Sequence, residues 1–517
     1  MFKKIIKNTS ILSLGTLISR VLGLVRLVLI SNFFGTGAIL EAFIVAFRLP
    51  NLFRSVFGEG FGDAVAVPVL SEYQDDKEEL FKIGNHLISL FTVVLLITSL
   101  LGMIFGKYLV SLIAPGFIAD GEKFALAVSF TRITFFYLFF IGLAVNFTSI
   151  LYSLKKFFIP AINPVFLNIS FIIGIIFFAD SLRKYILVIC VLVGGILQIV
   201  FPFVALRRSG FIFKFRIKEC FKDKVILRMV KLFLPRVWSS VIYHLSVIVD
   251  TVFSSLSVIV GVGALAAITY ANVLIQLPLA LIVLPLTRVA IVDLSLYHKQ
   301  SKMDDFKKLF VFSFQNIVFF VVPITFVFLF LSEGIIDVLF KRGEFDAHSL
   351  AITSSVFFFY SFGLFFFCMT KLFVSAFYAL KNTAIPAKLA ALSLVVNVIL
   401  SAALMFHLRI GGVALASSLA AVFNCFLLYK CLLKQIGAID WQNTPAQFVK
   451  VVVISLMIGF FSKMLWGILP WNKYINMSAI FIIDVCLFFS SGMIFGLGQA
   501  DYLKKWLLRA CNCEAKT

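Results

Sequence analysis

Charged side chains are scarce in this chain. Asp, Glu, Lys and Arg make up 14% of the 517 residues, whereas 61% are hydrophobic. A soluble globular chain has about a quarter of its residues charged, so the mean hydropathy of +1.06 assigns most of this chain to a lipid bilayer. The apolar runs, such as Leu87–Phe105 and Val311–Leu331, are continuous and do not alternate with polar residues. This pattern excludes a transmembrane β-barrel and predicts an all-α polytopic membrane protein.

Catalytic and nucleotide-binding signatures are missing as well. The sequence has no Gly-x-x-x-x-Gly-Lys, Gly-x-Ser-x-Gly or His-Glu-x-x-His motif, and its five histidines are scattered. Its eight cysteines form no Cys-x-x-Cys pair, and most of them lie in apolar runs, where cysteine is a small hydrophobic residue. These absences favour a transporter over an enzyme. Transport would be driven by an ion gradient, by the membrane potential or by the gradient of the substrate.

Acidic residues are also few, 25 against 46 basic ones, which gives a formal net charge of +21. Cytoplasmic loops of membrane proteins collect Lys and Arg, so this excess predicts no nucleic-acid partner. The basic clusters fall in alternate gaps between the apolar segments, which predicts that both termini are cytoplasmic and that the number of spans is even. The first apolar segment lacks a cleavage site and is expected to remain as a helix. About fourteen spans are expected, near residues 10–34, 39–58, 84–113, 127–153, 158–179, 184–206, 229–255, 262–290, 309–332, 350–378, 385–406, 411–433, 447–468 and 477–499.

Two short motifs occur twice in the same order. Tyr152–Pro160 matches Tyr378–Pro386 at five of nine positions with an offset of 226 residues, and Ala64–Tyr73 resembles Arg288–Tyr297 at an offset of 224. Two matches at nearly one offset indicate an internal duplication with six spans in each half. An even number of spans in each half makes the two repeats parallel.

The duplication divides the chain into four expected parts. These are an N-terminal lobe at 1–208, a cytoplasmic amphipathic linker at 209–228, a C-terminal lobe at 229–435, and the last two spans with a cytoplasmic tail at 436–517. Within the linker, Phe211–Lys224 mixes Phe, Ile and Lys in a pattern that predicts a helix on the membrane surface. A similar helix is expected on the outer side at Gly334–Arg342.

Charged residues inside membrane spans are costly and usually face a water-filled cavity or a partner. The first two spans hold Arg20, Arg26, Glu41, Arg48 and Arg54. An alternative is that arginines near helix ends extend to the lipid headgroups, which suits Arg48 and Arg54 better than Arg20 and Arg26. The excess of arginine predicts a cationic cavity for an anion, most simply a phosphate or pyrophosphate, because guanidinium groups bind phosphate at two points.

The C-terminal half has fewer charges within its spans. Asp250 lies within an apolar segment, Lys371 lies near the end of another, and Asn397, Ser401 and Ser417 follow Pro386. An acid among amide and hydroxyl oxygens suits a small cation or a proton. The alternative is a set of polar contacts between helices, and the residues alone leave both interpretations open.

Several motifs together resemble the MurJ/MviN family of bacterial lipid II flippases, which belongs to the multidrug/oligosaccharidyl-lipid/polysaccharide exporter superfamily. The resemblance runs in order over essentially the whole chain and rests on Ser19–Arg26, Ala42–Arg54, Glu59 with Gly60, Ala114–Phe117, Ile159–Asn168 and Phe377–Pro386. It implies two six-helix lobes in a V around a cationic cavity, and two further helices that form a groove for a lipid tail.

The resemblance also implies an activity. The family moves lipid II, an undecaprenyl-pyrophosphate-linked disaccharide peptide, from the cytoplasmic to the periplasmic leaflet of the bacterial inner membrane by alternating access. It thereby serves peptidoglycan synthesis. The implied partners are lipid II and membrane lipids, with no nucleic acid, and the protein is expected to be a monomer. No cofactor is expected apart from a sodium ion.

Site residues carry over position by position. Arg20, Arg26 and Arg54 match the cavity arginines of the family, Glu41 stands where Asp is common, and Arg48 matches a basic position. Lys371 is the cavity cation expected from the C-terminal half. The chain departs from the family pattern at Leu27, where an acid is common, and at Val273, where an arginine is expected.

A sodium site occurs in the C-terminal lobe of some family members. Asp250, Asn397, the carbonyl of Val413 and Ser417 match its pattern, and Ser401 replaces a second acid. The resemblance therefore predicts a sodium ion at these four ligands.

Other functions remain open at this point. The chain could export another lipid-linked oligosaccharide or act as a multidrug antiporter of the same superfamily, although a drug antiporter favours an acidic, aromatic cavity. It could also be a scaffold or scramblase that recruits cell-wall enzymes. An enzyme acting on the same lipid fits least, because no acid/base or metal cluster is visible.

Overall fold

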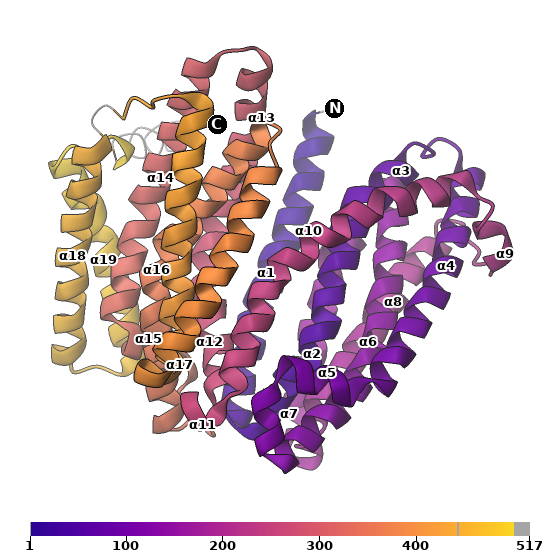
Figure 1. The fold of residues 1–517 in the computed structure, drawn as a ribbon, viewed down its shortest axis with the longest axis horizontal. Helices are drawn as coiled ribbons and strands as arrows, with labels where there is room; N and C mark the ends of the chain where they lie inside the picture. Colours follow the sequence, from indigo (N-terminus) through magenta and orange to yellow (C-terminus); the bar gives the residue numbers. More distant parts are fainter. Residues whose placement is uncertain (1, 442–443, 501–517) are drawn as a thin grey trace, which may run out of the picture. The chain divides into compact units, whose positions relative to one another are not determined.

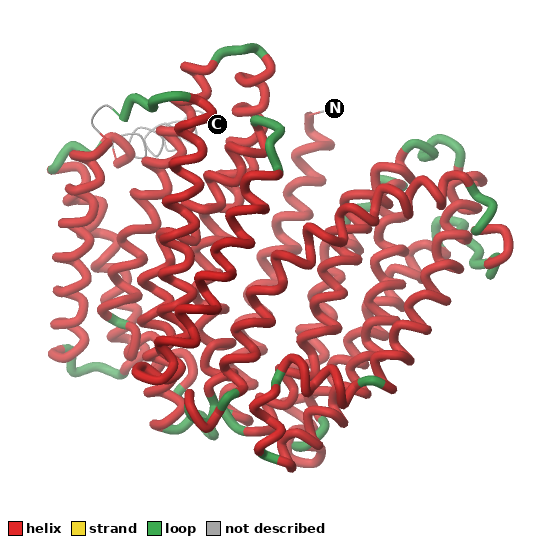
Figure 2. The backbone as a smooth tube through the Cα atoms, viewed as in Figure 1, coloured by secondary structure: helices red, strands yellow, loops and turns green. Residues whose placement is uncertain are grey.

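The computed structural model describes residues 2–441 and 444–500, and it describes the backbone alone at 2–13, 59, 63 and 235–244. Within these ranges every regular element is a helix (Figure 2). Eleven of the described helices are long and apolar enough to cross a membrane. The prediction of an all-α polytopic membrane protein is therefore confirmed.

Fourteen spans were expected, three more than these eleven helices. Each of the three differences has a local reason. The helix α2 (Ala38–Ser55) carries three charged side chains, and part of the side chains of α10 (Lys224–Ser255) lies outside the description. The element α17 (Ala384–Ile436) counts once, but its backbone leaves the helical region at Arg409, with φ 52° and ψ −133°. This break separates the two spans expected before and after residue 409.

The chain forms two compact units. Unit 1 comprises Met1–Val258 together with Arg342–Phe345, and unit 2 comprises Ile259–Lys341 together with Asp346–Thr517. The helix α10, which the duplication groups with the second half of the sequence, thus lies in unit 1.

Unit 1 is organised around one long helix, α6, which packs against α2, α4 and α8 (Figure 1). Its large side chains Phe130 and Tyr137 are fully buried there. The elements of unit 1 that precede α10 are α1 (Phe2–Phe34), α2, a π-helical segment η1 (Val56–Ala66), α3 (Val67–Ser71), α4 (Lys77–Ile104), α5 (Gly106–Ile113), a 3-10 turn η2 (Pro115–Ala119), α6 (Gly121–Ser153), α7 (Phe158–Leu182), α8 (Ile186–Arg207) and α9 (Ile217–Cys220).

Unit 2 has the corresponding helix α16 at its centre, in contact with α12, α13, α14 and α17. The last two helices, α18 and α19, pack on each other, and α18 packs on α14. After α11 (Ser257–Val260), which spans the boundary between the units, the elements are α12 (Ala264–Pro278), a π-helical segment η3 (Leu279–Val283), α13 (Leu284–Lys299), α14 (Met303–Phe330), α15 (Ser332–Phe340), α16 (Ala347–Ala379), α17, α18 (Thr444–Ile468) and α19 (Lys473–Ile494).

The two units repeat each other at an offset of 226 residues. The helices α4 and α14 are both 28 residues long, and α6 and α16 are both 33 residues long, each pair with this offset. The side chains of Asp120 and Asp346 cap α6 and α16 in the same way, by accepting the amide hydrogen three residues on. The duplication predicted from two short motifs is confirmed by these helix lengths and caps.

The repeated Tyr-x-Leu-Lys motif ends both central helices with the same turn. Lys155 and Lys381 have left-handed φ values of 59° and 58°. The amide of the next residue, Lys156 or Asn382, donates to a carbonyl five positions earlier at 2.9 Å in both cases. This bond pattern is a Schellman C-cap, so both copies of the motif terminate a helix.

The linker differs from its prediction. The helix expected at Phe211–Lys224 is wrong, because residues 211–216 are not helical and only Ile217–Cys220 forms one helical turn, α9. Side chains of α4 bind the backbone of the non-helical part. Asn85 and Ser89 form hydrogen bonds with backbone amides and a carbonyl that would pair with each other in a helix. A short helix close to the one expected at Gly334–Arg342 is present as α15.

Candidate functional site

The first helix brings an arginine into the interior of unit 1. Asn168 on α7 donates from Nδ2 to the carbonyl of Ser19 at 2.9 Å, which holds α1 against α7. Two turns further along α1, the guanidinium carbon of Arg26 lies 5.2 Å from the ring centre of Phe171, also on α7. The Nε atom of Arg26 is buried and has no hydrogen-bond partner among the described residues. Arg20, one and a half turns earlier, is exposed.

A second arginine of the predicted site comes close to the first. Arg54 ends α2 and is exposed, and its Nε donates to Asn51 Oδ1 at 2.8 Å. The charges of Arg26 and Arg54 act on each other and on the buried hydroxyl of Tyr137. The structure therefore places Arg26, Arg54 and Tyr137 within electrostatic range of one another.

The sequence did not single out Tyr137. Its hydroxyl donates to Gln198 Oε1 on α8 at 3.2 Å, and its ring lies 5.5 Å from that of Phe47 on α2. Tyr137 thus links α6 to the two helices beside it. A phenol within a run of Phe and Leu was the only available signal, because a buried hydroxyl needs a partner.

Arg48 lies on α2 and contacts α10. Its Nε donates to Thr251 Oγ1 at 3.0 Å, a contact within unit 1. Thr251 in turn donates to the carbonyl of Val247 at 2.7 Å, so the hydroxyl is held in place by its own helix. Arg48 therefore joins α2 to α10.

Glu41 is not a free acid in the site. It is buried on α2 and forms an ion pair with the Lys123 ammonium, which is also buried and lies 4.1 Å from the ring centre of Phe117. The sequence placed Lys123 in a loop between spans and did not pair it with Glu41. In the structure Lys123 therefore balances the charge of Glu41.

Arg26 and Arg54, called the arginine cluster here, can bind an anion. Among the described side chains, Arg20, Arg26 and Arg54 form no ion pair. Guanidinium groups bind phosphate oxygens at two points and keep their charge when partly buried. Two such groups beside a phenol provide several donors for one pyrophosphate.

The predicted residues of the C-terminal half fall in different units. Asn397 and Ser417 lie on α17 of unit 2, where Asn397 Oδ1 accepts hydrogen bonds from Ser401 Oγ at 3.2 Å and from Ser417 Oγ at 3.4 Å. Val413 is fully buried on the same element. Asp250 lies on α10 of unit 1. The oxygens of α17 suit a hard cation such as sodium.

The remaining cation, Lys371, is half-buried on α16 of unit 2. At Val273, where the family pattern has an arginine, α12 presents an apolar side chain, and the preceding Asn272 Oδ1 accepts a hydrogen bond from Gln276 Nε2 at 3.2 Å. In the described part of the chain, no three His, Cys, Asp or Glu side chains are grouped as metal ligands.

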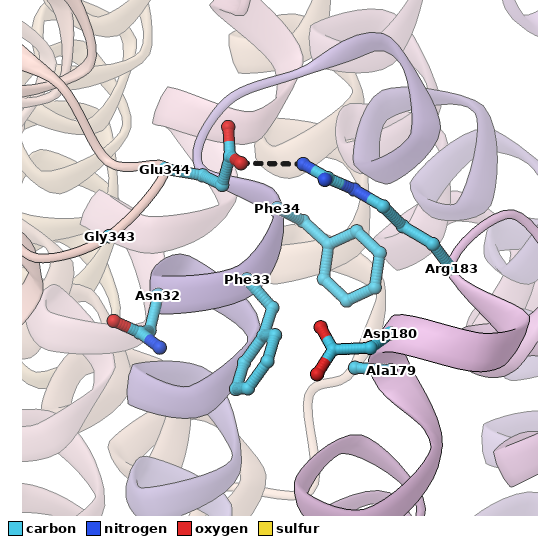
Figure 3. Close-up of a pocket in the computed structure, with 8 residues that line it drawn as sticks. All are labelled: Asn32, Phe33, Phe34, Ala179, Asp180, Arg183, Gly343 and Glu344. Carbon is cyan, nitrogen blue, oxygen red and sulfur yellow. Dashed lines mark hydrogen bonds and ion pairs between the residues drawn. The ribbon is translucent and has the colours of Figure 1, made fainter.

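A pocket of unit 1 lies away from the arginine cluster. It has a volume of about 380 Å³ at the ends of α1 and α7 and is lined by Asn32, Phe33, Phe34, Ala179, Asp180, Arg183, Gly343 and Glu344 (Figure 3). Its one arginine, Arg183, is paired with Glu344 at 2.6 Å, and Asp180 adds a negative charge. This charge balance does not favour a phosphate.

The fold and the site define a membrane transporter built from two duplicated helical units, with an arginine cluster in the first. Residues 30–483 match the family model described as lipid II flippase MurJ. A probable lipid II flippase MurJ of Buchnera aphidicola subsp. Schizaphis graminum is 30% identical over 96% of this chain and 98% of its own length. The lipid II flippase MurJ of Burkholderia cenocepacia is 28% identical over 95% of this chain and 97% of its own length.

Solved structures agree with these relatives. A lipid II flippase MurJ in an inward closed conformation has a TM-score of 0.78 and 26% identity, and the match covers 94% of this chain and 98% of that one. An inward-facing multidrug resistance transporter of the MATE family shares the fold, with a TM-score of 0.67 and 14% identity over 81% of this chain and 95% of that one. The chain belongs to the lipid II flippase MurJ family. This membership confirms the prediction of a multi-pass membrane transporter and not an enzyme.

Proposed function

We propose that this protein moves lipid II across the bacterial inner membrane for peptidoglycan synthesis. The proposal rests on one observation in particular: Arg26 and Arg54 lie within electrostatic range of each other and of Tyr137, and neither forms an ion pair among the described side chains. The family model and the curated relatives support lipid II as the substrate. Its pyrophosphate is the part that two guanidinium groups recognise best.

The remaining residues have separate roles in this proposal. Arg26 and Arg54 bind the pyrophosphate, while Arg20, Arg48 and Lys371 add positive charge along its path. Glu41 acts indirectly, since it compensates the charge of Lys123 and fixes α2 to α6. The substrate moves from the cytoplasmic to the periplasmic leaflet by alternating access, in which the binding cavity opens first to one side of the membrane and then to the other. The lobes at 1–208 and at 229–435 carry out this change. The linker at 209–228 joins the lobes, and 436–517 adds the last two helices.

In the proposed orientation both termini lie in the cytoplasm. The protein is proposed to be a monomer. The support for this orientation is the excess of Lys and Arg in alternate gaps of the sequence. Fusing a reporter that is active in only one compartment after residue 209 or after residue 343 tests the orientation. A cytoplasmic signal after 209 and a periplasmic signal after 343 are expected, and the reverse pattern would overturn it.

We also propose a sodium ion at Asn397, Val413 and Ser417 of unit 2. The support is the grouping of Asn397, Ser401 and Ser417 oxygens on α17. Transport by the full chain in vesicles is expected to slow when potassium replaces sodium, and Asn397→Leu is expected to remove this dependence. Equal rates in both salts would contradict the sodium site while leaving lipid II transport in place.

Complementation tests the proposed substrate. The full chain is expressed in bacteria depleted of their own lipid II flippase, and exposure of labelled lipid II on the periplasmic side is measured. Rescue with normal exposure is expected. Failure of a well-expressed chain to rescue would instead favour another lipid-linked oligosaccharide as the substrate, with Val273 as the first residue to change to arginine.

A further inference from the structure

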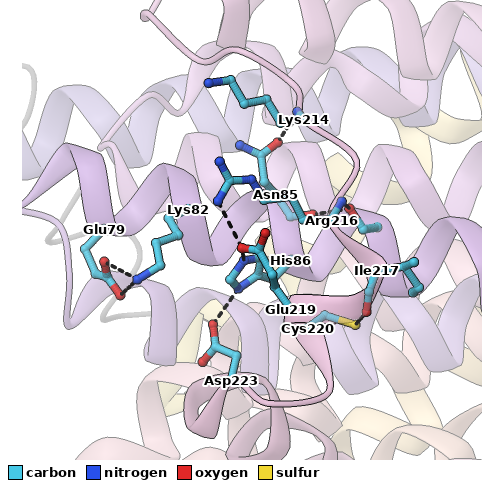
Figure 4. A network of polar contacts seen from close by, with 11 residues as sticks. Glu79, Lys82, Asn85, His86, Lys214, Arg216, Ile217, Glu219, Cys220 and Asp223 are labelled. Atoms are coloured by element: carbon cyan, nitrogen blue, oxygen red, sulfur yellow. Dashed lines mark hydrogen bonds and ion pairs between the residues drawn. The ribbon is translucent and has the colours of Figure 1, made fainter.

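The segment 211–223, called the strap here, joins α8 to α10 and is bound by one face of α4. Asn85 holds it at two points: Nδ2 donates to the carbonyl of Ile212 at 3.1 Å, and Oδ1 accepts the amide of Lys214 at 2.8 Å. Ser89 Oγ accepts the amide of Arg216 at 2.9 Å. Figure 4 shows Asn85, Lys214 and Arg216 of this contact. These bonds bind the backbone of the strap and therefore do not depend on its side chains.

The next contact along α4 is made by a histidine. His86 is 3% exposed and lies between two carboxylates of the strap. Its Nδ1 is 2.7 Å from Asp223 Oδ2, and its Nε2 is 3.3 Å from Glu219 Oε2. Asp223 is also the N-cap of α10, because its Oδ1 accepts the amide of Val225 at 2.8 Å. His86 thus connects α4 directly to the residue at which α10 begins.

These two contacts set a condition on the protons of the His86 ring. An ionised carboxylate only accepts hydrogen bonds, so both contacts can exist together only when both ring nitrogens carry hydrogen. Arg216 Nη1 binds Glu219 Oε2 at 2.9 Å, and hydrogen bonds from Arg216 and His86 hold the pKa of Glu219 below its usual value. With one proton fewer, a lone pair of the imidazole would face a carboxylate, and one contact would be lost.

Other charged groups on α4, α10 and the strap form ion pairs or are basic side chains that keep their charge near neutral pH. On α4, Lys82 binds Glu79 at 3.1 Å. On α10, Arg228 holds Glu72 through two hydrogen bonds at 2.8 and 2.9 Å. The strap adds Lys214 next to Arg216 (Figure 4). Among the described side chains of this network His86 is the one histidine, the residue type whose charge ordinarily changes between about pH 5 and 8.

We propose that His86 is a proton-operated latch that fixes the strap, and with it the start of α10, to α4. The doubly protonated ring closes the latch on Glu219 and Asp223. Loss of a proton releases Glu219 and loosens the strap, while the remaining N–H of the ring keeps its hydrogen bond to Asp223. The latch acts within unit 1, between α4 and the segment that leads into α10, so the pH on that side of the membrane sets how firmly the strap is held to α4.

Hydrogen exchange of the full chain in detergent, followed by mass spectrometry, tests the latch. The readout is the protection factor of peptides containing the amides of Lys214 and Arg216, which corrects for the intrinsic pH dependence of exchange. In the wild type, protection is expected to fall by about tenfold between about pH 5 and 8, the range in which histidine titrates and the size expected for one charge-assisted hydrogen bond.

Two variants separate the latch from a purely structural contact. Glu219→Gln changes an exposed side chain, and its amide can pair with either form of the ring, so protection is expected to be independent of pH. His407→Gln removes an exposed histidine on α17 and is expected to keep the wild-type response. The proposal is overturned if wild-type protection is the same at both pH values, or if Glu219→Gln responds as strongly as the wild type. Neither result bears on the transport of lipid II.

Discussion

Glu41 on α2 and Lys123 on α6 form an ion pair in the interior of unit 1, where their side chains are 1% and 5% exposed. A buried charge that loses its partner is costly, by about 3–5 kcal/mol in comparable cases. We therefore expect Lys123→Met or Glu41→Gln alone to lower the unfolding temperature of the purified protein strongly. Thermal unfolding in detergent measures this.

The double variant Glu41→Gln/Lys123→Met serves as the control for this pair. It removes both charges, so most of the lost stability is expected to return. It also separates the structural role of Glu41 from the substrate-binding role that the sequence indicated. A stable double variant that still transports lipid II supports the structural role, whereas a stable but inactive one would contradict it.

The close approach of α4 to α6 at Gly102 gives a prediction about packing. A Cβ atom at this position would lie 1.8 Å from Cδ1 of the buried Phe135. Gly102→Ala is expected to destabilise unit 1 by about 1–3 kcal/mol through overpacking. Gly121→Ala is the matched control, because nothing lies within 4 Å of its Cβ position. Equal unfolding temperatures for the two variants would show that α4 and α6 do not pack this closely.

The N-cap of α16 predicts a dependence on pH. Hydrogen bonds from the amide and hydroxyl of Ser349 lower the pKa of Asp346. Because the folded pKa is below the unfolded one, this contribution to stability is present above the usual Asp range and is lost as the pH falls through the folded pKa. Asp346→Ala is expected to cost about 1 kcal/mol near neutral pH and less in acid.

Asp346→Asn separates the charge from the cap. Asparagine caps a helix about as well as aspartate but does not titrate, so its stability difference from Asp346→Ala should not change with pH. Hydrogen exchange at the start of α16, measured at neutral and acidic pH, provides the comparison. A wild-type cap that is equally protected at both pH values would refute the assignment.

The sequence predicted the helices well because their signal is local. A continuous apolar run of sufficient length specifies a membrane helix wherever it occurs, and the Tyr-x-Leu-Lys motif specifies a helix end through its own turn. For the same reason the duplication could be recognised from two short motifs. The break at Arg409 was also predicted, as the gap between two apolar segments.

The features that the sequence did not predict depend on contacts between distant residues. The linker is not a helix because Asn85 and Ser89, more than a hundred positions earlier in the chain, bind its backbone. The pairing of Glu41 with Lys123 spans 82 positions, and the local pattern around each residue gives no sign of the other. Tyr137 was missed because a single phenol in an aromatic run carries no specific signal. The predicted arginines Arg26 and Arg54 lie on α1 and α2 of the same unit, within electrostatic range of each other.

The most direct test of the central claim is the rate at which lipid II reaches the periplasmic face when Arg26 is changed. Arg26→Ala is expected to lower the rate by at least about tenfold, the loss expected for one charge-assisted contact to phosphate. Arg26→Lys, which keeps the charge but loses the two-point geometry, should fall between that variant and the wild type. Lys463→Ala, which removes an exposed cation from α18, should behave as the wild type. If Arg26→Ala transports lipid II at the wild-type rate from an equal amount of protein in the membrane, the arginine cluster does not bind the pyrophosphate.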